Sequence, residues 1–320
     1  MKVLITGGAG FIGSHVAKAL VARGDEVVLF DDFNELLYPA SLKRARVAEF
    51  LGDAAPELVE ASLLDQDALS KAVTKDIDVV IHFGALANPR VSLDKEDEYT
   101  DVNVTGTLNV LKAATNAGVG KVIFAGSSSV YNDEQTPFKE SSYPLKPRSP
   151  YGASKAAAEV YCGMWHDLHQ LPITVLRFFS VYGPWGRPDM APFIFAEKIL
   201  GGETIEVSRD KRQRDFTCID DVVPAVLAAT EADLGFEVIN VGRGEPVHLS
   251  DLIMAIESAA GIEARITERE TPPGEMRVTY ADVSKAKKLL EYQPSISVQD
   301  GVKPMVAWIR DWWLNNAKSK

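Results

Sequence analysis

The sequence predicts an α/β protein with a doubly wound parallel sheet and a second, smaller α/β domain. Apolar runs rich in β-branched residues recur along the first half of the chain, at 2–6, 26–30, 78–83, 121–127 and 173–179. Longer helix-like stretches alternate with them, and glycines separate the first run from the helix-like stretch at 14–24. Gly24 and Gly118 stand where the helices of the first half should end. Strands that are apolar along their whole length and alternate with helices are typical of a parallel sheet covered on both faces.

The regular alternation of strand-like and helix-like segments stops at about residue 180. The segment 180–192, rich in proline and glycine, is expected to be a loop. Beyond it we expect a strand within 201–207, a helix at 219–231, a strand at 236–242 and a helix at 249–261 capped by Ser250.

These elements predict two domains and a C-terminal helix. The sheet domain should cover 1–180, with 215–240 returning to it, and the smaller domain should combine 181–214 with 241–320. Trp308 and Trp312 lie four residues apart, on one helical face. We expect this face to pack on its own domain rather than on a membrane surface, because the segment lacks a strongly basic face.

Composition narrows the class of partner. The chain has 320 residues, 46% of them hydrophobic, and a net charge of −11. That charge argues against nucleic acid as a main partner. Cys162 and Cys218 form neither a disulfide framework nor a metal site. We expect reduced thiols in a cytoplasmic protein, without a signal peptide or a membrane span.

The glycine cluster predicts a dinucleotide site. Gly7, Gly10 and Gly13 form a G-x-x-G-x-x-G turn directly after a strand and before a helix. Such a turn lets a pyrophosphate approach the backbone and the helix N-terminus. About 20 residues further on, Asp31 or Asp32 would meet the adenosine ribose and repel a 2′-phosphate, which favours NAD over NADP. The alternative is that the glycines only permit close packing of strand on helix.

A second group of residues predicts proton transfer. Tyr151 and Lys155 are four residues apart and would share one face of a helix. A nearby ammonium lowers the pKa of a tyrosine, so Tyr151 could act as a base. Ser127, Ser128 and Ser129 follow a predicted strand, at the edge where parallel sheets bind ligands. A serine turn that satisfies its own backbone is the simpler interpretation of Ser129.

These motifs resemble a known family. The turn Thr6-Gly7-Gly8-Ala9-Gly10-Phe11-Ile12-Gly13 resembles the T-G-x-x-G-F-x-G turn of extended short-chain dehydrogenase/reductases. Together with the serine stretch and the Tyr151–Lys155 pair, it resembles the nucleotide-sugar epimerase and dehydratase branch, along nearly the whole chain. The resemblance implies a Rossmann fold, NAD as cofactor, and Ser127, Tyr151 and Lys155 as catalytic residues.

The resemblance also implies a set of cofactor-binding residues. They are Gly7, Gly10, Phe11, Ile12, Gly13, Asp31, Asp32, Asn34, Ser62, Leu63, Phe83, Gly84, Ala85, Asn103, Tyr151, Lys155 and Phe178. One departure concerns Ser62, which stands where relatives often have an acid that binds the adenine amine.

The serine stretch favours epimerisation over elimination. Dehydratases and decarboxylases of this branch carry acidic residues where this chain has Ser127, Ser128 and Ser129. Segments at 33–46, 182–195, 212–221 and 272–294 resemble the UDP-glucuronate 4-epimerases. We therefore expect NAD-dependent C4 epimerisation of UDP-glucuronate to UDP-galacturonate through a 4-keto sugar, with Tyr151 as base and acid. Asn132, Cys218 and Glu275 depart from that group's usual residues.

A hexuronate needs a group that binds its carboxylate. Arg187 is the first candidate and Arg90 the second, because a guanidinium pairs with a carboxylate; a loop salt bridge is the alternative for Arg187. Arg214 is expected at the pyrophosphate by resemblance. The expected substrate residues are Arg90, Ser127, Ser128, Ser129, Tyr151, Ser180, Arg187, Met190, Phe193, Val207 and Arg214.

Other activities remain open from the sequence. The alternatives are a 4-epimerase of neutral UDP-hexoses or their N-acetyl forms, a dehydratase or decarboxylase, and a catalytically silent NAD-binding protein. The residues that favour a uronate over a neutral sugar are Ser180 and Arg187. The family resemblance also implies a homodimer formed through helices near 105–117 and 154–168.

Overall fold

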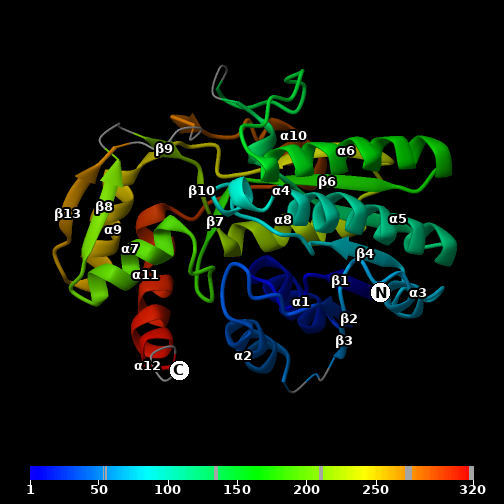
Figure 1. Ribbon diagram of the computed structural model, residues 1–320, viewed down its shortest axis with the longest axis horizontal. Helices are drawn as coiled ribbons and strands as arrows, with labels where there is room; N and C mark the ends of the chain where they lie inside the picture. Colours follow the sequence, from blue (N-terminus) through cyan, green and yellow to red (C-terminus); the bar gives the residue numbers. More distant parts are fainter. Residues whose placement is uncertain (53, 55, 133–135, 209–211, 271–275, 317–320) are drawn as a thin grey trace.

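The computed structural model describes residues 1–52, 54, 56–132, 136–208, 212–270 and 276–316. Figure 1 shows two lobes, with the larger one on the right and the smaller one on the left. Glu275 lies outside the described residues. No helix within the described ranges is both long enough and apolar enough to cross a membrane.

A seven-stranded sheet forms the larger lobe, and its strands run in the order β11-β6-β5-β4-β1-β2-β3 with all neighbours parallel. These strands are β1 (Lys2–Thr6), β2 (Glu26–Asp31), β3 (Glu57–Glu60), β4 (Val79–His82), β5 (Lys121–Ser127), β6 (Ile173–Phe178) and β11 (Phe236–Val241). The predicted class, a doubly wound parallel sheet, is confirmed. The strand order reverses between β1 and β4, which is where open parallel sheets bind ligands.

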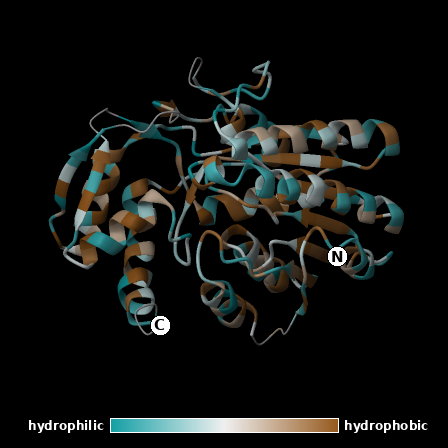
Figure 2. Cartoon of the chain, in the orientation of Figure 1, coloured by the Kyte–Doolittle hydropathy of each residue, from teal (hydrophilic) through white to brown (hydrophobic). Residues whose placement is uncertain are grey.

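Helices cover both faces of this sheet. They are α1 (Phe11–Arg23), α2 (Ala40–Leu51), α3 (Gln66–Ala72), α4 (Glu96–Thr100), α5 (Gly106–Ala117), α6 (Pro150–His169) and α8 (Ile219–Glu231). Alternate residues of β1 point to opposite faces: Val3 and Ile5 join the core that α1 and α8 complete, and Leu4 joins the core of α3, α5 and α6. Figure 2 shows the hydrophobic strands between these layers.

The expected helix ends at Gly24 and Gly118 are present. Gly24 has φ 92° and Gly118 has φ 75°, and each backbone N–H bonds to carbonyls of the preceding turn. The helix predicted at 249–261 is present as α9 (Leu249–Ala260), but its N-cap is His248 and not Ser250 as predicted. The reason is that β12 (Val247–His248) keeps the backbone extended through His248 by pairing with β9 (Gln213–Arg214).

The smaller lobe contains short strands drawn from distant parts of the chain. Its strands are β7 (Ser180–Tyr182), β8 (Thr204–Ser208), β9 (Gln213–Arg214), β10 (Phe216–Cys218), β12 (Val247–His248), β13 (Arg265–Arg269) and β14 (Val278–Thr279). Its helices are α7 (Ala191–Leu200), α9 (Leu249–Ala260), α11 (Val298–Trp308) and α12 (Leu314–Asn316). A further helix, α10 (Ser284–Leu290), lies within the predicted smaller domain but packs against β11 and α8 of the larger lobe.

The C-terminal tryptophans pack on their own chain. The rings of Trp308 and Trp312 are stacked with centroids 5.7 Å apart, and the ring of Trp185 lies 4.3 Å from that of Trp312. The loop predicted at 180–192 is shorter than expected, because a strand covers Ser180–Tyr182 and a helix begins at Ala191. Trp185 belongs to the loop that remains, so the C-terminal helix braces it. This arrangement agrees with the expectation that the Trp308 face is internal.

Candidate active site

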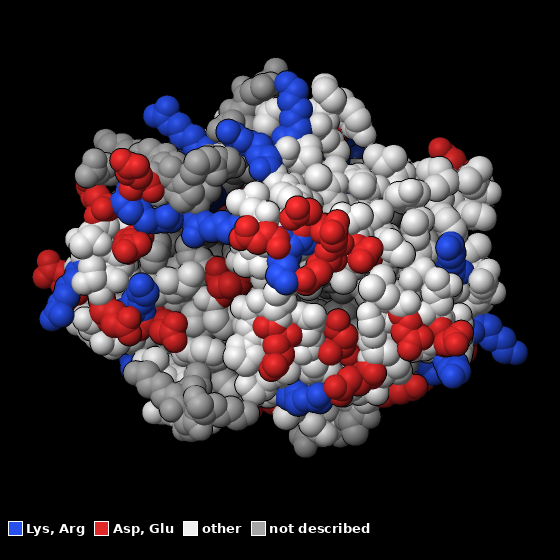
Figure 3. All heavy atoms as spheres, in the orientation of Figure 1, with Lys and Arg blue, Asp and Glu red and all other residues white. Residues whose placement is uncertain are grey.

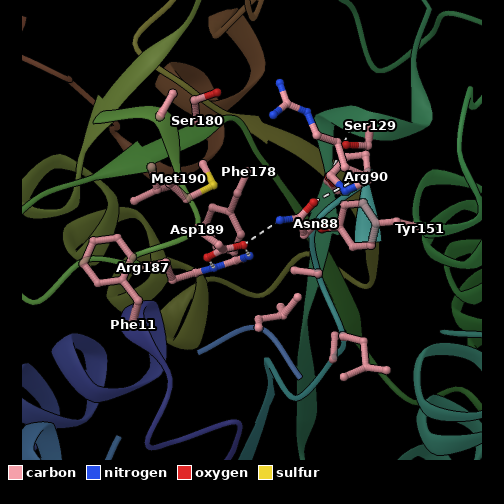
Figure 4. Close-up of a pocket in the computed structure, with 18 of the residues that line it drawn as sticks. Phe11, Asn88, Arg90, Ser129, Tyr151, Phe178, Ser180, Arg187, Asp189 and Met190 are labelled. Atoms are coloured by element: carbon pink, nitrogen blue, oxygen red, sulfur yellow. Dashed lines mark hydrogen bonds and ion pairs between the residues drawn. The ribbon is translucent and has the colours of Figure 1, made fainter. Parts of the chain in front are cut away.

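A cavity of about 730 Å³ runs from the glycine turn of the larger lobe into the smaller lobe. It lies at the carboxyl ends of β1, β2, β4 and β5. Within it lie these predicted residues: Gly7, Gly10, Phe11, Ile12, Gly13, Asp31, Asp32, Asn34, Leu63, Phe83, Gly84, Ala85, Arg90, Ser127, Ser128, Ser129, Tyr151, Lys155, Phe178, Ser180, Arg187, Met190, Val207 and Arg214. Figure 4 shows several of them.

Three predicted residues are not on the cavity wall. Ser62 accepts a hydrogen bond from the backbone N–H of Leu64 at 3.2 Å. Asn103 is buried, and its amide bonds to the backbone of Leu86 and to Ser154. Phe193 is buried in the tryptophan cluster of the smaller lobe. Asn103 therefore fixes the backbone of Leu86, which lines the cavity, and Phe193 supports the wall from behind.

The glycine turn makes a close backbone cradle. Gly7 has φ +67°, and a Cβ there would lie 2.6 Å from the N of Gly84. A Cβ on Gly13 would lie 2.3 Å from the carbonyl oxygen of Gly7. No side chain caps the first turn of α1, so that end of the helix can present its N–H groups to a phosphate. The geometry of the turn is therefore consistent with both interpretations of its glycines, a dinucleotide site and close packing of strand on helix.

Gly13→Ala tests this cradle. The added methyl group overlaps backbone atoms rather than a mobile side chain, so we expect the free energy of unfolding to fall by about 1–3 kcal/mol. Because the turn must shift, purified protein should also carry less NAD. Chemical denaturation and cofactor analysis measure the two effects. Gly118→Asn is the control, because its Cβ meets open space and Asn tolerates the left-handed conformation. Equal losses in both variants would contradict the steric explanation.

A buried histidine connects the cradle to the strand beside it. His82 accepts from the Thr6 hydroxyl at 2.7 Å through Nδ1 and contacts the Thr107 hydroxyl at 3.0 Å through Nε2. The Thr107 hydroxyl donates to the carbonyl oxygen of Asn103, so Nε2 must carry the proton of a neutral ring. Burial lowers the pKa of His82 to about 3, with a further contribution from Lys155. His82 therefore stays neutral and holds Thr6 against the N–H of Gly84, 3.1 Å away.

Asp31 has more partners than the sequence suggested. Its carboxylate accepts from the backbone N–H groups of Ala9 at 3.1 Å and Phe33 at 2.9 Å, so it fixes the glycine turn. Lys43 on α2 donates to the same carboxylate at 3.2 Å. Lys43 lines the cavity and was missed from the sequence, where nothing distinguishes it from a surface lysine. The expected contacts of Asp31 and Asp32 with a ribose remain predictions.

The catalytic candidates meet at the start of α6. Ser149 caps this helix, Pro150 is its first residue, and Tyr151 lies in its first turn. Lys155 follows one turn later and donates to the carbonyl oxygen of Ala125 at 2.9 Å. Burial lowers the pKa of Lys155 to about 8, although Glu159 raises it. The ammonium is therefore still mostly protonated at neutral pH.

The surroundings of Tyr151 differ from the sequence-based expectation. Burial is the largest influence and raises the pKa of its phenol, whereas the Ser127 hydroxyl and the Arg187 guanidinium lower it. Lys155, which was expected to lower this pKa, donates instead to the carbonyl oxygen of Ala125. The edge of the Tyr99 ring meets Tyr151 with centroids 6.2 Å apart. The net effect of these surroundings is to raise the pKa of the Tyr151 phenol above its ordinary value.

Arg187 lies in the same cavity and forms an ion pair. Its Nε and Nη2 donate to Asp189 at 3.0 Å and 2.5 Å, and Asn88 donates to Asp189 at 2.9 Å (Figure 4). The alternative interpretation, a loop salt bridge, therefore describes the contact seen. The sequence analysis missed both Asp189 and Asn88. The only signal in the sequence was the short spacing between Arg187 and Asp189, which allows an ion pair between them.

Basic side chains surround the end of the cavity in the smaller lobe. Its wall includes Lys198, Arg212, Arg214 and Arg269. Arg214 donates to the carbonyl oxygens of Gln213 and Met276, both at 2.8 Å. Acidic groups predominate over the centre and lower right of the face in Figure 3, and Lys and Arg gather along the upper left. A chain of net charge −11 thus contains a local cationic region beside its cavity.

Comparison with known proteins agrees with this geometry. Residues 3–242 match the NAD dependent epimerase/dehydratase family. A UDP-glucuronate 4-epimerase of Thermodesulfobacterium geofontis is 38% identical over 311 residues, which cover 96% of each chain. UDP-glucuronate 4-epimerase 1 of Arabidopsis thaliana is 36% identical, over all of this chain and 79% of that protein.

A solved structure extends the likeness. The UDP-glucuronic acid 4-epimerase of Bacillus cereus, in complex with UDP-glucuronic acid and NAD, has a TM-score of 0.91 and 36% identity. The match covers 97% of this chain and 99% of that one. The chain therefore belongs to the NAD dependent epimerase/dehydratase family, which confirms the family and the cofactor that the motifs indicated.

Proposed function

We propose that this protein converts UDP-glucuronate to UDP-galacturonate by epimerisation at C4. The observation that carries the proposal is that Tyr151 and Arg187 share one cavity, with Arg187 close enough to influence the pKa of the Tyr151 phenol. A proton-transfer group and a carboxylate-binding group then lie within the reach of one sugar ring. The relatives named as UDP-glucuronate 4-epimerases further support this substrate.

The roles of the side chains follow from the chemistry of a 4-keto intermediate. Tyr151 removes the proton of the C4 hydroxyl and later returns it, and Ser127 hydrogen-bonds the same oxygen. NAD held at the glycine turn would supply the hydride acceptor for oxidation at C4 and the hydride donor for the return to the opposite face of the sugar. Lys155 supplies a buried positive charge that favours the phenolate once the site is assembled. No step requires a carboxylate in the 127–129 stretch.

Recognition of the substrate divides between the two ends of the cavity. The guanidinium of Arg187 has more N–H donors than Asp189 accepts, so it can also bind the uronate carboxylate. Ser128, Ser180 and Arg90 are further candidates for that end. Arg214 and its basic neighbours suit the pyrophosphate, while Met190 and Val207 contribute apolar wall. The Arg187–Asp189 pair also suits a neutral sugar, which keeps neutral UDP-hexoses as the second candidate.

One assay separates these activities. The purified protein is incubated without added NAD, in one reaction with UDP-glucuronate and in a parallel reaction with UDP-glucose, and the nucleotide sugars are separated. UDP-galacturonate is the expected product. A UDP-pentose would indicate decarboxylation, turnover of UDP-glucose alone would indicate a neutral-sugar epimerase, and no turnover of either would indicate a binding protein.

Arg187→Met tests recognition of the carboxylate. Loss of a charge-assisted pair should raise the KM for UDP-glucuronate by about 10- to 100-fold. The affinity for UDP, which lacks the sugar, should stay within about twofold. Arg90→Met, at the second candidate, is the matched comparison. Unchanged KM in Arg187→Met with a raised KM in Arg90→Met would transfer the role to Arg90.

We also propose a homodimer in the cytoplasm. Support for the dimer comes from α6, where Val160, Tyr161 and Leu168 expose apolar side chains. Sedimentation should give the mass of two chains, and the mass of a monomer would refute the dimer.

Support for a cytoplasmic location comes from Cys162 and Cys218, which are buried and unpaired. Cell fractionation tests that prediction.

A further inference from the structure

A buried arginine on α2 contacts the loop that carries Arg187. Arg46 is 0% exposed, and its Nε and Nη2 donate to the carbonyl oxygens of Trp185 at 2.8 Å and Gly186 at 2.9 Å. Its Nη1 donates to the Tyr38 hydroxyl at 3.3 Å. These partners are two backbone carbonyls and a phenol rather than a carboxylate. Burying a guanidinium is costly, so its retention in the core suggests a specific task.

The two carbonyls belong to a backbone in an unfavourable conformation. Trp185 has φ +59°, a left-handed conformation that residues with a Cβ rarely adopt. The fork of Arg46 binds the carbonyls of two successive peptide units, the one that joins Trp185 to Gly186 and the one that joins Gly186 to Arg187. It therefore fixes the direction from which the Arg187 side chain enters the cavity. A lysine could not bridge both carbonyls in this way.

Arg187 is thus held from two sides, its backbone by Arg46 and its guanidinium by Asp189. We propose that Arg46 is a positioning residue that sets the affinity of the cavity for a sugar carboxylate by fixing Arg187. This inference rests on the proposed role of Arg187 as the carboxylate-binding group. Arg46 lies 139 residues from Trp185 in the sequence, so no local motif indicates the contact.

The loop has other supports, which makes the expected effect local. The Trp185 ring packs against three other rings. Its centroid lies 4.3 Å from that of Trp312, 5.0 Å from that of Trp308 and 5.7 Å from that of Phe50. Removing the fork of Arg46 leaves this packing in place but frees the two carbonyls to rotate. The Arg187 backbone should then sample several orientations, while the basic end of the cavity, in the smaller lobe, stays intact.

The experiment compares Arg46→Met and Arg46→Lys with Arg44→Met. Arg44 is the matched control, an exposed arginine of the same helix that pairs with Glu60. Calorimetry on the NAD-loaded protein measures the Kd for UDP-glucuronate and for UDP. We expect Arg46→Met to weaken UDP-glucuronate about tenfold and UDP less than about twofold, with Arg44→Met unchanged. Near-UV circular dichroism reports whether the tryptophan cluster is intact.

The double variant Arg46→Met/Arg187→Met decides whether Arg46 acts through Arg187. If it does, the double variant binds UDP-glucuronate no more weakly than Arg187→Met alone. Additive losses, an equal loss of UDP affinity, or unchanged Kd in Arg46→Met would overturn the proposal. Should Arg46→Met fail to fold, Arg46→Lys retains the charge and carries the same comparisons. If Arg187→Met left the Kd for UDP-glucuronate unchanged, the proposed role of Arg187 in binding the carboxylate would itself be refuted.

Discussion

Tyr151→Phe should lower kcat for UDP-glucuronate epimerisation by about a thousandfold. The substitution removes the hydroxyl that exchanges a proton with the sugar and keeps the aromatic ring. That ring meets the edge of Tyr99 and fills the wall of the cavity, so the fold and the NAD content should not change. Product separation gives the rate, and cofactor analysis of the purified variant gives the NAD content.

The matched control for this variant lies on the same helix. Tyr161→Phe removes a hydroxyl from a residue that is 36% exposed on α6 and outside the cavity, so its kcat should equal that of the parent protein. If Tyr151→Phe kept more than about a tenth of the parent rate, another group would have to carry the proton. Ser127 would be the first to test, because it is the hydroxyl that lowers the pKa of Tyr151.

The larger lobe was predictable because its signals are local. Most strands of the sheet are short apolar runs, β3 (Glu57–Glu60) being the exception, and the helices α1 and α5 have their own end signals at Gly24 and Gly118. The smaller lobe was less predictable, because β9, β12 and β14 are two-residue strands that pair across long sequence separations. The N-cap of α9 at His248 depends on that pairing, which no window around Ser250 contains.

The residues of the candidate site likewise divide into those that local motifs predicted and those that only long-range contacts reveal. The glycine turn, the serine stretch and the Tyr151–Lys155 pair are each contained in a short segment, and the structure brings them to one cavity. The contact of Asn88 with Asp189 joins residues 101 positions apart, and that of Arg46 with Gly186 joins residues 140 apart. One sequence holds no record of such contacts, so these supporting residues became visible only in the fold.

A buried ion pair lies directly behind the catalytic helix. Arg177 on β6 and Glu159 on α6 are 2% and 5% exposed, and Arg177 donates to Glu159 at 2.7 to 3.2 Å through Nε and Nη2. Arg177 also donates to the Tyr131 hydroxyl at 2.6 Å, which donates to Asn240 on β11 at 2.8 Å. Glu159 follows Lys155 by one helical turn, so this network ties α6 to the sheet next to the site.

Glu159→Gln should therefore lower the free energy of unfolding by about 3–5 kcal/mol. The change leaves the Arg177 guanidinium buried without a counter-charge, which costs more than the pair itself contributes. Chemical denaturation measures the loss. Replacing both partners, as Glu159→Leu with Arg177→Met, should cost less than Glu159→Gln alone, because no uncompensated charge remains at the pair.

An exposed ion pair provides the comparison for this prediction. Arg44 and Glu60 are 54% and 52% exposed, so Glu60→Gln should change the free energy of unfolding by less than about 0.5 kcal/mol. If Glu159→Gln lowered the free energy of unfolding by equally little, water or a rearrangement of Lys155 would have to compensate the buried charge of Arg177. If instead the double replacement were the most damaging variant, the hydrogen bonds to Tyr131 and Asn240, rather than the charge pair, would hold α6 in place. The order of the three losses therefore identifies which part of the network orients the helix that carries Tyr151.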